Sequence, residues 1–353
     1  MPFAEARATG GRYDFVLPPE LEAHEPPELR GASRADVRLL VTDTVHGVRH
    51  SHFDSLPDHL ESGDLLVAND SMTYPACVQA TRETGEPVTL YFSHVGPGEC
   101  VNIAITATTT VLAAARKASL SAGERVSLPG GARATFFGLH RRSRRMWITE
   151  LSLPIPYFAY FARYGKPIAY PHVTVDLPIE TYQTIFARTI GSSEMPSAGR
   201  PFSAATLSRL TSRGIELATL TLHAGVSSAE RDELPLEEWR DVPAKTAVAV
   251  RLAQNRGRRV IAVGTTVVRA LESSLDRRHR VVPTRGWTSL HITPDRPMRA
   301  VGGLLTGFHE PTSTHLAILE SIGGRAPIEC AYRAALAGRY LWHEFGDSHL
   351  ILP

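Results

Sequence analysis

Cysteine is scarce in this sequence, and its spacing excludes the structures that paired cysteines support. The three cysteines, Cys77, Cys100 and Cys330, lie far apart and form no Cys-x-x-Cys pair. This spacing argues against a disulfide framework and against a cysteine-based zinc site, and it fits a reducing cytosol.

Long apolar runs are missing as well. No uninterrupted apolar segment approaches the roughly 20 residues that a membrane-spanning helix needs, and residues 1–12 contain no apolar signal-peptide core. We therefore expect a soluble cytoplasmic protein.

Neither sign of charge dominates, because 38 Lys and Arg residues face 36 Asp and Glu residues. A protein that coats nucleic acid is more basic, so any RNA contact here would need a local patch. The sequence also lacks a P-loop, a Gly-x-Gly-x-x-Gly turn after a strand, a Gly-x-Ser-x-Gly elbow and a metal-binding motif. These absences argue against ATP use and against the common dehydrogenases and hydrolases.

The 353 residues, 43% of them hydrophobic, are enough for two domains or for one domain with an insertion. Between about residues 77 and 151, short β-rich runs separated by Gly and Pro turns predict a small antiparallel barrel. From about Thr181 onward, strands alternate with helices. The predicted fold is α/β: a mixed α/β, barrel-like catalytic domain made of residues 1–75 and 152–353, interrupted by a β-barrel domain at residues 76–151.

Hydrophobic periodicity and turn residues predict the individual elements. Ser203, for example, is a suitable N-cap for the helix that follows it. The predicted strands are 37–43, 64–68, 88–92, 101–105, 133–139, 146–151, 217–223, 259–263, 288–293 and 348–352, and 46–53 is a predicted hairpin region. The predicted helices are 203–214, 244–256, 265–275, 314–322 and 327–341.

Polar blocks follow several of the predicted strands. Asn69-Asp70-Ser71 comes after strand 64–68 and either binds a nucleoside or only forms a turn. His223 ends strand 217–223 and is either an acid or base near neutral pH or a structural histidine. His309, before Pro311, leaves the same two alternatives open.

Gly264-Thr265-Thr266 lies at a predicted strand-to-helix turn. The free N–H groups of a helix N-terminus suit a carboxylate or a phosphate. The alternative is an ordinary threonine cap, with Arg269 and Glu272 forming a surface ion pair. Pro196–Gly199 is a tight turn of small residues that allows a ligand close to the backbone, or a plain loop.

Two further groups are interpreted as surface features. His46, His50 and His52 lie on the predicted hairpin with no cluster of carboxylates or cysteines, so a metal site is not expected there. A basic run on the predicted barrel either meets an RNA backbone or is a solvated hairpin face. The run consists of Arg141, Arg142, Arg144 and Arg145.

Several blocks, in their order along the chain, resemble one family: the S-adenosylmethionine:tRNA ribosyltransferase-isomerases of queuosine synthesis. The resemblance extends from about Tyr13 to Leu352. Besides the blocks above, it includes Leu17–Leu21, Gly63–Val67, Tyr182–Thr184, Leu222–Gly225, Val263–Glu272, Phe308–Thr314 and Gly346-Asp347.

The resemblance implies a reaction, a co-substrate and a partner. The family transfers and isomerises the ribosyl part of S-adenosylmethionine onto the 7-aminomethyl-7-deazaguanine of a tRNA, which gives epoxyqueuosine and releases adenine and methionine. No metal is needed for this chemistry. We accordingly expect S-adenosylmethionine as co-substrate, no metal, tRNA as partner, and a monomer or weak homo-oligomer.

The resemblance also implies site residues. The predicted catalytic residues are His223, His309 and Asp347. The residues predicted to bind S-adenosylmethionine are Asn69, Asp70, Ser71, Ser197, Ala198, Gly199, Gly225, Gly264, Thr265, Thr266, Arg269, Ser313 and Thr314.

The chain departs from the family pattern at several polar positions. Met72 and Cys77 stand where the family has arginines, Pro201 where it has a histidine, and Thr312 where it has a lysine. The stretch Val226-Ser227-Ser228 replaces Gly-Thr-Phe, and Glu237-Glu238-Trp239 occupies the region of Met-His-Ser-Glu. These changes leave two alternatives to the family reaction: a different, non-tRNA acceptor, or a non-catalytic protein that binds S-adenosylmethionine.

Overall fold

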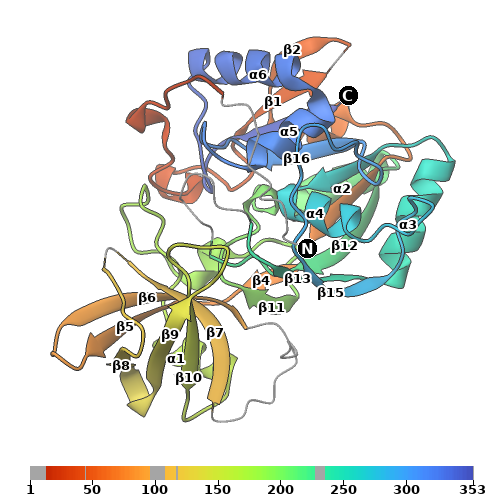
Figure 1. Cartoon of the computed structure of the whole chain (residues 1–353). Helices are drawn as coiled ribbons and strands as arrows, with labels where there is room; N and C mark the ends of the chain where they lie inside the picture. The colour runs from red at the N-terminus through yellow and green to blue at the C-terminus, as the bar shows by residue number, and fades with distance from the viewer. Residues whose placement is uncertain (1–12, 44, 96–107, 117, 227–234, 353) are drawn as a thin grey trace.

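The computed structural model describes residues 13–43, 45–95, 108–116, 118–226 and 235–352 (Figure 1). They form a large mixed α/β part and a smaller closed barrel. Fold class and inserted barrel are therefore as predicted. The predicted strand 101–105 and residues Ser227 and Ser228 lie outside the described residues.

The large part is built on one sheet of nine described strands, in the order β15-β13-β12-β3-β14-β16-β17-β1-β2. Neighbours are parallel along β12-β3-β14-β16 and again between β17 and β1. The sheet is open rather than barrel-like, with β15 and β2 at its edges. The strands are β1 (Arg38–Asp43), β2 (Gly47–His52), β3 (Leu65–Asn69), β12 (Glu216–Leu222), β13 (Glu238–Val242), β14 (Val260–Val263), β15 (Thr284–Thr288), β16 (Gly303–Gly307) and β17 (Ser348–Leu352).

The central strands are apolar at nearly every position because both faces of the sheet are covered. Leu65 and Val67 of β3 belong to the core that the sheet forms with α3, α4, α5 and α6. Leu66 and Ala68 belong to the core on the opposite face, together with residues of α2 and of the 3-10 helix Phe53–His59. The helices are α1 (Tyr157–Tyr164), α2 (Ala204–Ser212), α3 (Ala244–Asn255), α4 (Thr265–Glu272), α5 (His315–Gly323) and α6 (Arg325–Ala337). None of the described helices is long and apolar enough to cross a membrane.

The barrel closes in the strand order β10-β7-β6-β5-β8-β9. Its core is shared with α1, which contributes Tyr157, Tyr160 and Phe161. The barrel strands are β5 (Cys77–Arg82), β6 (Pro87–Val95), β7 (Thr108–Ala115), β8 (Arg125–Ser127), β9 (Arg133–Leu139) and β10 (Trp147–Ser152). They start and end beside the predicted limits of 76 and 151, and the division into domains itself stays a prediction.

A two-stranded parallel ribbon joins the two parts along the chain. Its strands are β4 (Ser71–Thr73) and β11 (Thr189–Ser192), and β4 lies between β3 of the sheet and β5 of the barrel. This ribbon starts two residues after the end of β3, so it brings β11 to the edge of the sheet.

The local predictions are correct where propensity and burial agree. Ser203 caps α2, because its Oγ accepts a hydrogen bond from the Thr206 N–H at 3.1 Å. The predicted strand 288–293 was wrong: β15 ends at Thr288, and β16 was not predicted. The glycines at both ends of β16 weaken its strand pattern in the sequence. Glycine is needed at position 303, because a Cβ there would lie 3.1 Å from a side-chain carbon of Ile261.

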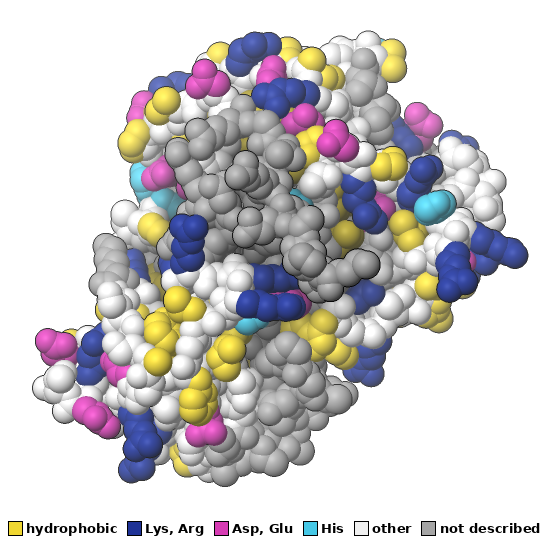
Figure 2. Space-filling model, viewed as in Figure 1, with side chains coloured by type: hydrophobic (Ala, Val, Ile, Leu, Met, Phe, Trp, Pro, Cys, Tyr) yellow, Lys and Arg dark blue, Asp and Glu magenta, His cyan; other side chains and the backbone are white. Residues whose placement is uncertain are grey.

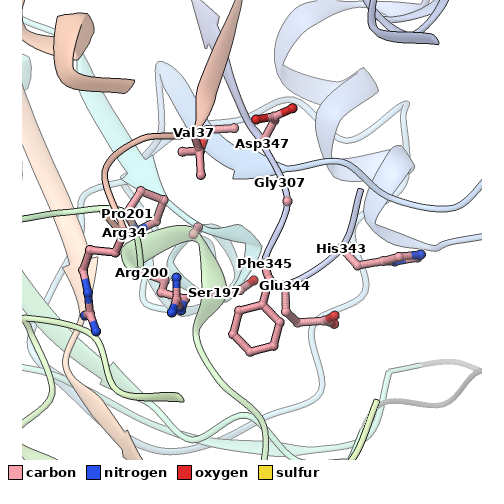
Figure 3. A pocket seen from close by; sticks show the side chains of 13 residues that line it. Arg34, Val37, Ser197, Arg200, Pro201, Gly307, His343, Glu344, Phe345 and Asp347 are labelled. Atoms are coloured by element: carbon pink, nitrogen blue, oxygen red, sulfur yellow. The ribbon is translucent and has the colours of Figure 1, made fainter. Parts of the chain in front are cut away.

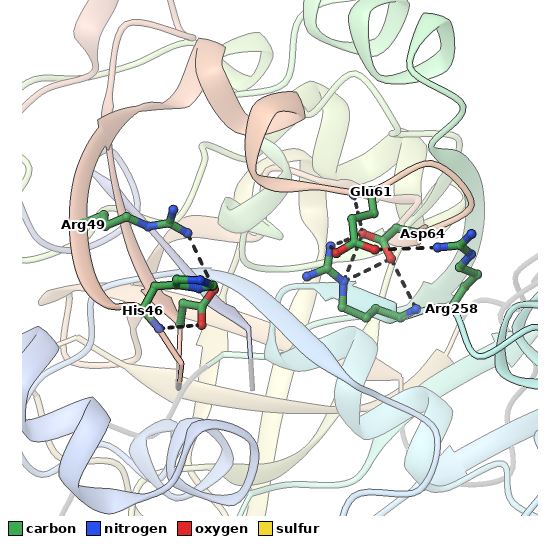
Figure 4. Close-up of polar contacts among 7 residues, drawn as sticks. His46, Arg49, Glu61, Asp64 and Arg258 are labelled. Atoms are coloured by element: carbon green, nitrogen blue, oxygen red, sulfur yellow. Dashed lines mark hydrogen bonds and ion pairs between the residues drawn. The ribbon is translucent and has the colours of Figure 1, made fainter.

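An ion pair between buried Asp64 and partly buried Arg259 anchors the amino ends of β3 and β14 (Figure 4). Asp64, which is 1% exposed, accepts hydrogen bonds from Nε of Arg259 at 3.1 Å on both carboxylate oxygens. It also accepts from the Glu61 N–H at 2.8 Å. The pair holds two central parallel strands in register at the edge opposite to their carboxyl ends.

We expect Asp64→Asn to lower the free energy of unfolding by about 2 kcal/mol, because the substitution leaves a partly buried guanidinium without its anion. Urea denaturation measures this. The matched control is Asp58→Asn, since Asp58 makes only exposed ion pairs with Arg209 and Arg213 and should shift the value by less than about 0.5 kcal/mol. Equal effects of the two substitutions would contradict the anchoring role.

Candidate functional site

The carboxyl ends of the parallel strands β12, β3, β14 and β16 lie along one side of the sheet, here called its carboxyl edge to distinguish it from the edge strands β15 and β2. The predicted polar blocks follow these ends. Asn69 ends β3, His223 follows β12, Gly264 follows β14, and His309 comes two residues after β16. Ligands of open parallel sheets bind outside this edge. Blocks from four distant parts of the sequence therefore meet there.

Asn69 completes the pairing of β3 with β12 where the backbone ladder ends. Its Nδ2 donates to the Leu222 carbonyl at 2.7 Å, and its Oδ1 accepts from the Leu222 N–H at 3.0 Å. Nδ2 also lies 3.3 Å from Oγ1 of Thr266, at the start of α4. The side chain thus joins the ends of three neighbouring strands.

Asp70 lies beside this junction. Its Oδ1 accepts a hydrogen bond from Oγ1 of Thr221 at 2.6 Å, and its carbonyl accepts from the N–H groups of Arg188 and Thr189. Burial raises the pKa of the Asp70 carboxyl. Asp70 therefore fixes the start of the ribbon and carries a carboxylate at the sheet edge.

Three side chains form a hydrogen-bonded chain between the ribbon and β12. Oγ of Ser71 lies 2.7 Å from Nδ1 of His223 and 2.6 Å from Oγ of Ser192, and all three residues are buried. Oγ of Ser192 accepts from the Ala224 N–H at 3.0 Å. The ribbon therefore holds one nitrogen of the imidazole and sets the orientation of the ring.

The other nitrogen of His223, Nε2, differs from Nδ1 in its surroundings. Nε2 is buried and makes no hydrogen bond in the described part of the chain. Burial lowers the pKa of His223 to about 4, so the imidazole is neutral near pH 7. A neutral, oriented ring with one unpartnered nitrogen is suited to accept or donate a proton.

Gly191 makes room for this ring. A Cβ at Gly191 would lie 2.5–2.6 Å from three atoms of the imidazole of His223. Only glycine permits β11 to approach His223 so closely.

The turns 196–199 and 264–266 contact each other. Gly264 has a φ of 96°, and a Cβ there would lie 3.3 Å from Cβ of Ala198. Thr265 is buried behind this turn. The short 3-10 helix Ser197–Gly199 is thus packed against the start of α4, and two of the predicted binding blocks adjoin.

Arg269 does not present a free guanidinium. Its Nε donates to the Leu290 carbonyl at 3.1 Å, and its other nitrogens bond to the Leu236 carbonyl and to the Glu238 carboxylate. Glu238 in turn accepts from the Gly225 N–H at 3.3 Å. Arg269 therefore holds the segment after His223 in place.

His309 lies apart from His223. Since β16 is three strands away from β12, the spacing of strands puts about 14 Å between the two ends. Nε2 of His309 lies 3.0 Å from Oγ1 of Thr306, and Nδ1 lies 3.3 Å from Nδ1 of His315. Burial and the neighbouring His315 lower the pKa of His309 well below its usual value. The structure does not join the two predicted catalytic histidines.

Two other predicted groups bond within the chain. Asp347 accepts hydrogen bonds from the backbone and guanidinium of Arg38 and from the Leu341 N–H, at 2.7–3.1 Å. Oγ of Ser313 accepts from the His315 N–H at 3.2 Å, and Thr314 directly precedes α5. These contacts order the segments before β17 and α5.

A hollow lies at this edge, and Figure 3 shows its lining. Ser197 and Arg200 line it from one side, and Glu344 and Phe345, from the segment before β17, line it from another. Ala198 also belongs to the lining. Arg200 donates to both carboxylate oxygens of Glu28 at 3.0 and 2.9 Å. Two of the predicted binding residues, Ser197 and Ala198, thus border a surface opening.

The groups interpreted as surface features are exposed or compensated. His46, His50 and His52 are exposed, as predicted. Arg141 and Arg142 lie 3.0 and 3.4 Å from Glu237. Figure 2 shows Lys and Arg side chains scattered over the visible face with Asp and Glu among them, not gathered in one stripe.

Sequence reasoning missed Ser192, Glu238 and His315. Ser192 reaches Ser71, the partner of His223, only because β11 pairs with β4, and no local pattern indicates that pairing. The signal that was available is Gly191, a glycine within a strand. Glu238 and His315 carry no such signal.

Known proteins resemble this chain along its whole length. A profile of the family described as "Queuosine biosynthesis protein" matches residues 11–351. The S-adenosylmethionine:tRNA ribosyltransferase-isomerase of Stenotrophomonas maltophilia is 31% identical over 351 residues, which cover 97% of this chain and 98% of that protein. The Thermus thermophilus protein of that name is 35% identical over 355 residues, which cover 96% and 98%. A crystal structure of S-adenosylmethionine tRNA ribosyltransferase from Thermotoga maritima has 26% identity and a TM-score of 0.52, covering 96% of this chain and 99% of that chain.

We expect a nuclear magnetic resonance titration to give His223 a pKa of about 4, with its signals assigned by their loss in His223→Gln. The unfolded chain then binds more protons than the folded one between pH 4 and about 6.5. Folding stability is therefore full above pH about 6.5 and falls as the pH drops toward 4. A measured pKa at or above 6.5 would contradict the burial of the ring.

Proposed function

Because this chain belongs to the queuosine biosynthesis protein family, we infer that it is an S-adenosylmethionine:tRNA ribosyltransferase-isomerase. The enzyme transfers and isomerises the ribosyl part of S-adenosylmethionine onto 7-aminomethyl-7-deazaguanine in tRNA. The product is epoxyqueuosine, and adenine and methionine are released. S-adenosylmethionine is a co-substrate in this reaction, and tRNA is the second substrate.

The observation that carries this inference is the family match over residues 11–351, which is nearly the whole chain. It includes both the sheet and the barrel, so it does not rest on one shared domain. The convergence of the polar blocks at one sheet edge supports it, because an active site of this kind is assembled from the ends of several strands.

We assign the first proton transfer to Nε2 of His223. The positive sulfur of S-adenosylmethionine acidifies the neighbouring ribose carbon, and a base must remove a proton from it. Nε2 is buried and unpartnered, and burial keeps the ring neutral by lowering its pKa. A dry site also prevents water from taking the place of the acceptor.

Ser71 and Ser192 have a positioning role in this proposal. With the proton of His223 on Nδ1, this nitrogen donates to Oγ of Ser71, and the lone pair of Nε2 is free to act as base. Ser71 then donates to Ser192. The same hydrogen bonds stabilise the positive charge that the ring gains.

We assign the co-substrate to the adjoining turns. The N–H groups of Thr265 and Thr266 at the start of α4 suit the methionine carboxylate, and Asn69 and Asp70 lie beside them for the nucleoside. Ser197, Ala198 and Gly199 supply a backbone without bulk. Gly225 lies next to this site. Its N–H donates to Glu238, which is paired with Arg269, so Arg269 acts on the site without touching the co-substrate.

His309 and Asp347 receive supporting roles. His309 bonds to Thr306 and His315 and orders the segment that holds Ser313 and Thr314. Asp347 holds Arg38 and the turn before β17. Both order the segments that follow β16 and precede β17, while the proton transfer takes place at His223.

One observation favours testing the acceptor separately. Cys77 stands where the family has an arginine, and here it is buried, with a thiol pKa raised by burial to about 11. It offers no positive charge to a phosphate. A small amine acceptor in place of tRNA is therefore the second candidate, and binding of S-adenosylmethionine without turnover is the third.

We expect His223→Ala to lower kcat by about 10²–10⁴-fold while the fold is retained, because general-base catalysis contributes this much. Ser71→Ala should give a smaller loss, since the ring keeps its base but loses its orientation. The control is His59→Ala, which removes a half-buried histidine bonded to Ser51 in another part of the fold. Full activity of His223→Ala with a circular dichroism spectrum like that of the parent would remove His223 from the mechanism.

The assay that tests the function itself measures adenine and methionine release from S-adenosylmethionine by mass spectrometry. We expect release only with tRNA that carries 7-aminomethyl-7-deazaguanine, and none with the same tRNA lacking this base. Release with a small amine and without tRNA would show that the acceptor is a small amine and not tRNA. Binding of S-adenosylmethionine without release on any acceptor would mean a non-catalytic protein.

A further inference from the structure

Two imidazoles and one carboxylate converge at the edge of the hollow. His172 comes from the segment between α1 and the 3-10 helix Ile179–Tyr182, whereas His343 and Glu344 come from the segment before β17. One ligand atom of each residue lies within 4.8 Å of the others. Figure 3 shows Glu344 beside Phe345 and the His343 ring turned away from Ser197 and Arg200.

The converging atoms lack ordinary partners. Nε2 of His172, Nε2 of His343 and Oε2 of Glu344 are buried, and none of them makes a hydrogen bond within the described residues. The contact recorded between them is an ion-pair distance of 3.0 Å from Nε2 of His172 to Oε2 of Glu344. A buried polar atom without a hydrogen bond costs about 1–3 kcal/mol, so three such atoms at one point require an explanation, and a bound ion is one.

The Glu344 carboxylate of this cluster has no basic side chain other than histidine beside it in the described part of the chain. Within the described ranges, no Lys or Arg lies within ion-pair distance of Glu344. The arginines of the neighbouring hollow, Arg34 and Arg200, are paired with Glu28 instead. A second carboxylate, Glu22, lies 3.6 Å from Nε2 of His343. Glu344 thus has no Lys or Arg beside it in the described ranges, and His172 is its one recorded ion-pair contact.

The two rings pack against each other. The imidazoles of His172 and His343 stack at 4.2 Å with 18° between their planes, and Tyr170 stacks on His172. His343 has a φ of 71°, a left-handed conformation that is rare for residues other than glycine. Such strain persists where the surroundings fix it, and it is concentrated at functional sites.

We propose that His172, His343 and Glu344 bind one divalent metal ion of the zinc class. Two histidines and one carboxylate form a set of three protein ligands typical of zinc sites that keep a fourth position open. Zinc bonds of about 2.0–2.2 Å place ligand atoms roughly 3.3 Å apart. The ligand atoms lie within 4.8 Å of one another, so the widest separation must close by up to about 1.5 Å to reach that value. One of the two stacked rings must also turn, because an imidazole binds a metal in its own plane.

The ion ties two distant segments together beside the proposed active site. The hydroxyl of Tyr170, the neighbour of His172, accepts a hydrogen bond from the Met195 N–H at 3.3 Å. Met195 lies three residues after Ser192, which contacts Ser71 of the His223 group. The metal therefore stabilises the segment from Met195 to Ser192, which contacts the His223 group, and it takes no part in the proton transfer.

The test measures zinc binding to the chelator-treated full chain by isothermal titration calorimetry, with Co²⁺ absorption as a second probe of the coordination. We expect about one ion per chain, and at least about 100-fold weaker binding for Glu344→Gln and for His343→Asn. Asparagine tolerates a positive φ, so the second variant keeps the backbone conformation. The matched control is His46→Gln, which removes an exposed histidine 3.0 Å from the Asp43 carboxylate (Figure 4) and should leave binding unchanged.

Three results would overturn the proposal. One is that the parent chain binds no zinc. Another is equal affinity in the parent, Glu344→Gln and His343→Asn, with circular dichroism spectra showing that all three are folded. The third is loss of binding in His46→Gln, which would place the ion at the exposed histidines of β2 and its preceding turn instead.

Discussion

The parallel pairing of β12, β3, β14 and β16 is the constraint on which the proposed active site depends. Parallel strands end at the same edge, so the residue that follows each strand is delivered to one line of the surface. The four blocks lie far apart in sequence, and each is ordinary turn chemistry by itself. The partly buried Asp64–Arg259 pair lies at the opposite, amino ends of β3 and β14 and keeps these two strands in register.

Burial then decides what the delivered side chains can do. Both the nitrogen and the oxygen of the Asn69 amide are bonded to the backbone of Leu222. His223 is buried, with one nitrogen bonded to Ser71 and one that makes no hydrogen bond within the described residues. The same reasoning identifies the cluster of His172, His343 and Glu344. In both places we infer a ligand site from a buried polar atom that makes no hydrogen bond within the described residues.

The sequence allowed prediction of the mixed α/β class, the inserted barrel and the blocks at the sheet edge. Those features depend on hydrophobic periodicity, on turn residues and on the order of short motifs along the chain. It did not reveal the partners of the blocks. Arg269 was predicted to face the co-substrate, but its nitrogens hold Glu238 and two backbone carbonyls. Ser192 was not predicted at all, because β11 pairs with β4 across more than a hundred residues.

What the sequence by itself determined is therefore the family, the order of elements and the set of polar residues placed at strand ends. These follow from local pattern, since a strand, a cap or a turn is specified by residues a few positions apart. Only the tertiary structure decided which of these residues touch. It separated His309 from His223 by three strands and brought His172 to His343 and Glu344. Strand order and side-chain burial are set by long-range packing, which no short stretch of sequence encodes.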